Sequence, residues 1–168
     1  MVLERWNSLS AEQATGAILP CCGSWAWARG MAARRPLRDE AALLAASDET
    51  WHNLALSDWM EAFQSHPRIG ETHSPQPVLS QAASWSEHEQ KRITDGDAAV
   101  KLALEQANHE YERRFGRIFI VCATGRSATE ILEMLRQRLQ NDAETELREA
   151  AEQQQYITHV RLKKWLQG

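Results

Sequence analysis

The chain has 168 residues and a mass of 19.1 kDa, which is the size of a single domain. Hydrophobic residues make up 43% of it and charged residues 25%; these are ordinary values for a globular protein and exclude low-complexity or collagen-like sequence. The net charge of −4 argues against a dedicated nucleic-acid binder, because such proteins usually carry a basic surface.

The sequence has the features of neither a membrane protein nor a secreted one. Its apolar runs stay well below the ~18 residues of a transmembrane helix, and the N-terminal segment MVLERWNSLSAEQ lacks the apolar core of a signal peptide. Cys21, Cys22 and Cys122 are too few for a disulfide framework, so we expect reduced thiols. Together these features predict a cytoplasmic protein with no membrane partner.

The distribution of glycine and proline favours helices. The chain has 8 glycines and 5 prolines, and two long stretches, 37–66 and 126–167, contain neither. Alanine is frequent and β-branched residues are few, as helix interiors prefer. The best strand candidate, 118–122, is a short apolar run that periodicity cannot classify. We therefore expect an all-α fold, a single-domain bundle of about eight helices over residues 1–168.

Capping residues mark the predicted helices in the first part of the chain. Ser10 and Gln13 form a capping box for a helix that ends near Leu19. The other predicted helices here are one that follows Gly23 and stops before Pro36, two that begin after Asp39 and Asp48, and one that runs from Ser57 to about Ser65. The last of these ends there because Pro67 disfavours the helical conformation in the residue before it.

The next part of the chain begins with a long predicted loop over 67–83, a stretch rich in proline. Ser84 and Ser86 then each begin an S-x-x-E capping box, which predicts the start of a helix at this point. Three further helices are expected to run from Asp97 to Gly116, from Ser127 to about Leu139 and from Asn141 to about Trp165.

His66 is the first candidate for chemistry. It is predicted to lie where a helix ends and an irregular loop begins, and Pro67 restrains the chain directly after it. A helix C-terminus favours a cation, and histidine titrates near neutral pH, so this position suits a general acid or base. The alternative is a histidine that only caps the helix.

The segment Ser86-Glu87-His88-Glu89-Gln90 is the second candidate. At a helix N-terminus its backbone N–H groups would bind an anion, and its serine, glutamate and glutamine side chains would bind a polar ligand. The alternative is a capping box between Ser86 and Glu89 that needs no ligand.

Two further features concern buried polar groups. The apolar run from Phe119 to Ala123 must satisfy its backbone polar groups, either with a small polar ligand or, as a buried connector, within the protein. Arg161 lies inside the apolar stripe of the last predicted helix, four residues after Ile157 and four before Trp165. A buried arginine needs an anionic partner, which is either a protein carboxylate or a substrate carboxylate.

Metal and nucleophile patterns are weak. His66, Glu71 and His73 are close in sequence, but the chain has no HExxH motif and no cysteine pair with zinc spacing, so we expect no metal site. A phosphate loop, a dinucleotide fingerprint and a GxSxG serine are also absent from the sequence. The apolar setting of Cys122 is expected to raise the pKa of its thiol and make it a poor nucleophile.

Taken in order, these motifs resemble the OHCU decarboxylases, which act on 2-oxo-4-hydroxy-4-carboxy-5-ureidoimidazoline. The resemblance covers nearly the whole chain, and its motifs are SHPRIGE at 65–71, SxxEQ at 86–90, YxxxFG at 111–116, FIVCATGRS at 119–127 and IxxxRL at 157–162. The sequence departs from the family after Gln90, where relatives often have a glycine and this chain has Lys91 and Arg92.

The resemblance implies an all-α, cofactor-free enzyme of urate breakdown, usually a homodimer, that decarboxylates OHCU to (S)-allantoin. It makes His66 the acid/base residue and Glu89 its catalytic partner. The residues that it implies for substrate binding are Pro67, Ser86, Glu87, His88, Gln90, Arg161 and the segment Phe119, Ile120, Val121, Cys122 and Ala123.

Two alternatives come from other classes of function. The chain could be a non-catalytic helical module that binds a partner through its tryptophans and through the arginines at 29, 34, 35 and 38, with His66 as a helix cap. It could also be a hydrolase of a related ureido compound, because the same acid/base pair could activate water.

Overall fold

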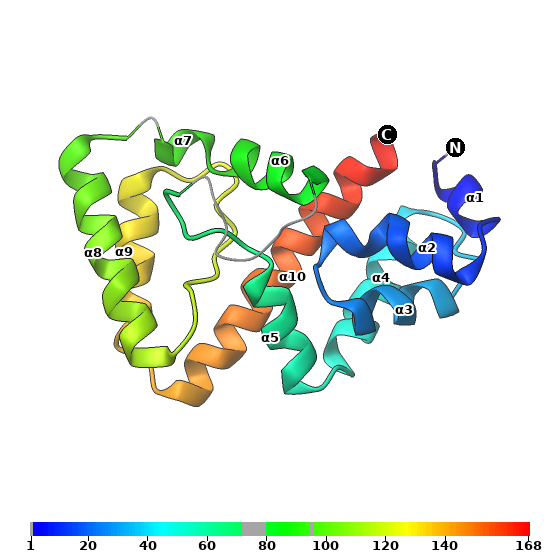
Figure 1. Ribbon diagram of the computed structural model, residues 1–168, viewed down its shortest axis with the longest axis horizontal. Coiled ribbons are helices and arrows are strands. Elements are labelled where there is room, and N and C mark those ends of the chain that lie inside the picture. Colours follow the sequence, from blue (N-terminus) through cyan, green and yellow to red (C-terminus); the bar gives the residue numbers. More distant parts are fainter. Residues whose placement is uncertain (1, 72–79, 95) are drawn as a thin grey trace. The chain divides into compact units, whose positions relative to one another are not determined.

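The computed structural model describes residues 2–71, 80–94 and 96–168, and over them it contains helices and no strands (Figure 1). Its helices are α1 (Val2–Asn7), α2 (Ala11–Ile18), the 3-10 helix η1 (Leu19–Cys21), α3 (Trp25–Ala33), α4 (Glu40–His52), α5 (Leu56–Gln64), α6 (Ser80–Glu89), α7 (Lys91–Thr94), α8 (Ala98–Phe115), α9 (Ala128–Arg138) and α10 (Ala143–Gln167). The all-α prediction is confirmed, and the described α-helices of at least eight residues number eight, as expected. No helix in the described part of the chain is both long and apolar enough to cross a membrane.

The chain divides into two compact units. The first consists of Met1–Ala62 and Gln155–Gly168, and the second of Phe63–Gln154. Helix α10 runs through the boundary at 154–155, so its first half belongs to the second unit and its second half to the first.

Several helix ends follow the predicted capping chemistry. Ser10 and Gln13 form both hydrogen bonds of a capping box at the start of α2, and Ser127 and Glu130 do the same at α9. Asp39 caps α4 by accepting a hydrogen bond from the Ala42 N–H. Gly116 ends α8 with a φ of +69°, a left-handed conformation that glycine adopts at little cost.

Three predicted helix starts outside the candidate site are wrong. Asp48 does not begin a helix but lies inside α4, where its carboxylate accepts hydrogen bonds from Gln155 (2.9 Å) and His159 (2.6 Å). Helix α5 begins at Leu56 rather than after Ser57, and the Asp58 carboxylate accepts a hydrogen bond from the Ala55 N–H. The side chain of a short polar residue can accept hydrogen bonds from other side chains as well as from the backbone N–H groups at a helix start. Its spacing in the sequence therefore does not show that it caps a helix.

The third correction concerns α10, which Asp142 rather than Asn141 caps. The Asp142 carboxylate accepts hydrogen bonds from the backbone N–H groups of Glu144 (3.1 Å) and Thr145 (2.9 Å). The Asn141 amide instead donates to Glu146 and Glu149.

The first unit is built around tryptophan side chains. Trp6 is 1% exposed, donates its indole N–H to the Ala14 carbonyl and packs edge-on against Trp165, with ring centroids 5.7 Å apart. Arg35 closes the C-terminal end of α1 because its guanidinium donates to the carbonyls of Trp6 (2.8 Å) and Leu9 (2.7 Å). At least this member of the arginine cluster therefore has a structural role within the unit.

The second unit has its own core, in which α8 and α9 lie side by side (Figure 1). A buried polar network crosses it: Arg138, 3% exposed, forms an ion pair with Glu146, 0% exposed, at 2.5 Å. Arg138 also donates to the Ile120 carbonyl, and the Tyr111 hydroxyl donates to Glu146. Burial and the Glu146 carboxylate raise the pKa of Tyr111. This network attaches the segment 119–123 to α9 and α10.

Candidate active site

His66 lies where the sequence predicts, just after the end of α5. Its backbone N–H donates to the Phe63 carbonyl (3.3 Å), and the residue is 7% exposed. Pro67 follows it and begins the irregular loop that leads to Glu71. The chain therefore leaves the helix and presents a buried imidazole within two residues.

The His66 ring is held by a glutamine of α10. Its Nε2 atom lies 2.7 Å from Oε1 of Gln154, which is 0% exposed. An amide oxygen only accepts hydrogen bonds, so Nε2 is the donor. The partner lies 88 residues further along the chain.

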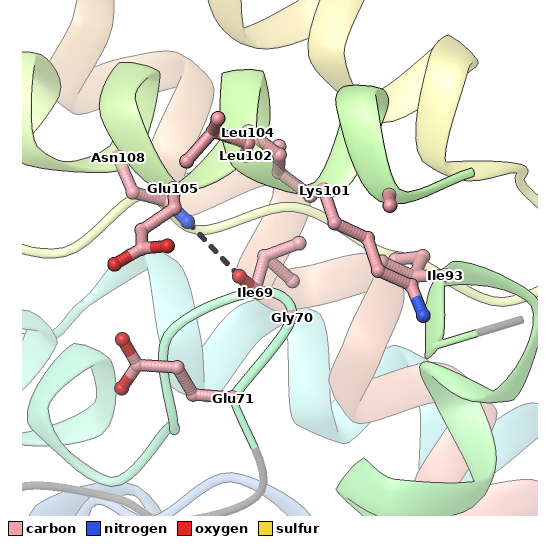
Figure 2. A pocket seen from close by; sticks show the side chains of 10 residues that line it. Ile69, Gly70, Glu71, Ile93, Lys101, Leu102, Leu104, Glu105 and Asn108 are labelled. Carbon is pink, nitrogen blue, oxygen red and sulfur yellow. Dashed lines mark hydrogen bonds between the residues drawn. The ribbon is translucent and has the colours of Figure 1, made fainter. Parts of the chain in front are cut away.

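The loop after His66 is tied to the unit at three points. The Gly70 N–H donates to Oε1 of Gln90 (2.9 Å). The Asn108 amide donates to the Ile69 carbonyl (2.9 Å), as Figure 2 shows. Arg68 forms a two-point ion pair with Glu112 of α8, with N–O distances of 2.5 and 3.1 Å. The SHPRIGE motif is thus a fixed loop, and one group of the SxxEQ motif helps to fix it.

The SxxEQ motif itself lies at the end of a helix rather than at a start. Helix α6 begins at Ser80, so Ser84 and Ser86 are interior residues and cap nothing, and the predicted helix N-terminal anion site is wrong. Alanines at 82 and 83 sustain the helix before the motif, and an S-x-x-E spacing occurs inside helices as readily as at their starts.

Burial sorts the side chains of this motif by helix face. Ser86 is 4% exposed and Gln90 is 7% exposed, and the two lie on one face because they are four residues apart. Glu89 is half-buried, whereas Glu87 and His88 are exposed. Ser86, Glu89 and Gln90 therefore face the interior of the unit.

The segment Phe119–Ala123 is irregular, and much of its backbone bonding is internal to the protein. The Cys122 N–H donates to Oε1 of Gln153 (2.9 Å), and the Ala123 carbonyl accepts from the Arg126 N–H (3.0 Å). The Ile120 carbonyl accepts a hydrogen bond from the Arg138 guanidinium. For these atoms the structure supports the alternative of a buried connector.

The Glu89 carboxylate affects the ionisation of Cys122, which belongs to this segment. Burial raises the pKa of the Cys122 thiol, as predicted, and the negative charge of the Glu89 carboxylate raises it further. The raised pKa makes Cys122 a poor nucleophile.

Arg161 belongs to the first unit, on the second half of α10. It is 1% exposed, which confirms the predicted buried position. Its positive charge lowers the pKa of the thiols of Cys21 and Cys22, but burial outweighs it and raises both, that of Cys22 to about 12. These cysteines are free thiols, as expected.

A cavity of about 490 Å³ is lined by the loop after His66 and by α8 (Figure 2). Ile69, Gly70 and Glu71 line it from the loop, and Lys101 and Glu105 line it from α8. Within the described residues, no group of three His, Cys, Asp or Glu side chains could hold a metal ion. His73 lies outside the described residues.

Sequence reasoning missed the roles of two consecutive glutamines. Gln154 could have been noticed, because it is a polar residue in the apolar stripe of α10. Gln153 gives no such signal; only the fold shows that it accepts the Cys122 N–H.

Comparisons with known proteins support one family. The sequence matches the OHCU decarboxylase family over residues 7–163. It is 39% identical over 145 residues to the uric acid degradation bifunctional protein TTL of Arabidopsis thaliana, covering 86% of this chain and 44% of the plant protein. It is 34% identical over 97 residues to the 2-oxo-4-hydroxy-4-carboxy-5-ureidoimidazoline decarboxylase of Mus musculus, covering 58% of this chain and 54% of the mouse protein. The matches thus span about half the length of these two relatives.

A solved structure agrees with these matches. The fold is similar to a crystal structure of OHCU decarboxylase in the presence of (S)-allantoin, with a TM-score of 0.78 and 30% sequence identity. That similarity covers 95% of this chain and 100% of the other.

Proposed function

Because the chain belongs to the OHCU decarboxylase family, we propose that it decarboxylates OHCU to (S)-allantoin in the breakdown of urate. One observation carries the proposal: three family motifs that are separate in sequence are linked in the second unit. Gln90 of SxxEQ accepts a hydrogen bond from Gly70 of the His66 loop. The consecutive residues Gln153 and Gln154 of α10 bind Cys122 of the segment 119–123 and the His66 ring.

The substrate explains why such a site would need no cofactor. One ring carbon of OHCU carries a hydroxyl and a carboxylate, and its neighbour is an imine-type carbon that bears the ureido group. When the bond to the carboxylate carbon breaks and CO₂ leaves, its electron pair forms a double bond to the imine carbon. The π electrons of the imine move to its nitrogen, which takes up a proton. The substrate therefore supplies the electron sink that cofactors provide in other decarboxylations.

The role of the protein is then to accelerate the proton transfers and to direct them to one face. The enol formed by loss of CO₂ must lose its hydroxyl proton and gain a proton on the carbon that bears the ureido group. We assign this transfer to His66, whose buried ring is held by Gln154. Glu89 is assigned the orientation of the ring or the substrate. Protonation from one face would produce a single allantoin enantiomer.

Substrate binding is assigned to Pro67, Ser86, Gln90 and the segment 119–123. The resemblance also assigns Arg161, whose buried charge suits a carboxylate or a ureido oxygen. Burial favours Ser86 and Gln90 over the exposed side chains of Glu87 and His88.

The resemblance also supports proposals about domain organisation, location in the cell and oligomeric state. We propose one OHCU decarboxylase-like domain made of both units, because the family match spans them. We also propose that the protein is cytoplasmic and that it is a homodimer. Light scattering on the purified protein tests the dimeric state directly.

The test of function uses circular dichroism of freshly generated OHCU. Because OHCU decays without enzyme, the readout is acceleration together with handedness. The expected result is fast growth of a one-handed allantoin signal. In His66→Ala we expect the rate to fall by a factor on the order of 10² or more. The control is His109→Ala, which removes an exposed histidine of α8.

Other outcomes separate the alternatives. Decay no faster than in buffer, with racemic product, contradicts the proposal and favours the non-catalytic helical module. Consumption of a ureido compound without release of CO₂ favours the hydrolase. A His66→Ala protein that keeps the full rate removes the assignment of His66 but leaves the activity.

A further inference from the structure

We propose that Gln154 is a positioning residue that keeps a proton on Nε2 of His66, so that the proton exchanged with substrate passes through Nδ1. This inference deepens the proposed function and rests on it for its kinetic part. Its structural part, the protonation pattern of the ring, can be tested without substrate.

The first step is the chemistry of the contact. Nε2 of His66 lies 2.7 Å from Oε1 of Gln154. The amide oxygen accepts hydrogen bonds but is far too weak a base to take a proton near neutral pH. Nε2 therefore keeps its proton in the neutral ring as well as in the imidazolium ion. The two states differ at Nδ1, and that is where a transferred proton must enter or leave.

The second step is the rigidity of the contact. Gln154 is 0% exposed and His66 is 7% exposed, so neither side chain has room to reorient without disturbing its neighbours. The adjacent Gln153 binds the Cys122 N–H and so anchors this turn of α10 to the segment 119–123. On the other side, the backbone of His66 bonds Phe63 and continues into Pro67. The ring is fixed through both its backbone and Nε2.

The third step is the choice of a neutral partner. A carboxylate at position 154 would also accept the Nε2 proton, but its charge would stabilise the imidazolium ion and raise the pKa of His66. An amide orients the ring without adding charge. A residue that must both take and release a proton near neutral pH is best served by such a partner.

The direct test is nitrogen-15 NMR of the histidine side chains in the substrate-free protein, with His66→Ala for assignment. We expect the neutral His66 ring to show a protonated Nε2 and an unprotonated Nδ1. Gln154→Ala is expected to give a mixture of the two neutral tautomers. Gln154→Glu is expected to keep the Nε2 proton and to raise the pKa of His66. A wild-type ring protonated on Nδ1 instead overturns the inference.

The kinetic test compares the same variants by circular dichroism of the reaction. We expect Gln154→Ala to lower kcat on the order of 10-fold to 10²-fold, the scale of a misplaced reacting group, with a smaller change in KM. Gln154→Glu is expected to retain more activity than Gln154→Ala and to shift the pH–rate profile to higher pH.

The matched control is Gln155→Ala, the next residue of α10, whose amide donates to Asp48. It is expected to leave the His66 tautomer and the rate unchanged. If Gln154→Ala folds and keeps the wild-type kcat, Gln154 does not position the ring. If the wild type has no activity, the proposed function fails, while the NMR result still decides the protonation pattern. Gln154→Glu provides the comparison if Gln154→Ala does not fold.

Discussion

The buried pair of Arg138 and Glu146 is the contact whose loss we expect to cost most stability. The two side chains are 3% and 0% exposed and lie 2.5 Å apart. Arg138 also donates to the Ile120 carbonyl. Glu146 additionally accepts hydrogen bonds from Tyr111 and Asn141.

The variant Arg138→Met removes one charge and leaves the Glu146 carboxylate buried without it. Breaking a buried ion pair from one side costs about 3–5 kcal/mol. For a protein of this length, that loss corresponds to a fall in Tm of roughly 6–20 °C. The double variant Arg138→Met/Glu146→Leu removes both charges, so its loss of stability is expected to be smaller than that of Arg138→Met alone.

The free energy of unfolding is measured by urea denaturation followed by tryptophan fluorescence, with thermal melts beside it. The control is Arg148→Met, which breaks an exposed pair with Glu144 (side chains 70% and 82% exposed) and is expected to cost less than about 0.5 kcal/mol. A loss below about 1 kcal/mol in Arg138→Met, or a double variant that is less stable than that single variant, refutes the reasoning.

Three further predictions concern glycine and cysteine positions. Gly30→Ala places a Cβ 2.5 Å from Thr50 Cγ2, and we expect overpacking to cost about 1–3 kcal/mol, offset in part by ~1 kcal/mol of helix propensity, in thermal melts. Gly70→Ala forces a φ of +89° on alanine, which is expected to cost about 1–2 kcal/mol in urea denaturation and to lower the decarboxylation rate. Burial raises the pKa of Cys22 to about 12, whereas an unfolded thiol has a pKa of 9.0. The unfolded state therefore loses its proton first, and between pH 9.0 and about 12 the contribution of Cys22 to stability falls by about 1.4 kcal/mol per pH unit. Denaturation at mildly and strongly alkaline pH should show a shallower fall in the free energy of unfolding for Cys22→Ala than for the wild type.

The helices that the sequence predicts correctly are those whose ends depend on neighbouring residues. The capping boxes at Ser10 and Ser127 and the left-handed stop at Gly116 each involve groups within four residues of one another. Such contacts can be predicted from spacing because the helix itself brings the groups together.

Two of the wrong predictions have the opposite property. Asp48 has the chemistry of a helix cap, yet its partners on α10 lie 107 and 111 residues away. Ser86 has the spacing of a capping box but lies near the end of α6, which begins at Ser80. A short motif does not contain this information, since it depends on where the helix begins and on which face is covered.

The same distinction explains what could be predicted of the candidate site. Position in the chain indicated His66 and the SxxEQ motif, but nothing local indicated that Gln153 and Gln154 would meet segments 31 and 88 residues away. Three glutamines thus hold two segments, the His66 loop and 119–123, because Gln90 holds the Gly70 N–H of that loop in the same way. Amides do not titrate, so this frame stays constant over the pH range in which a histidine changes charge. A pH–rate profile should therefore report the ionisation of His66 and the substrate rather than the loss of the geometry that holds them.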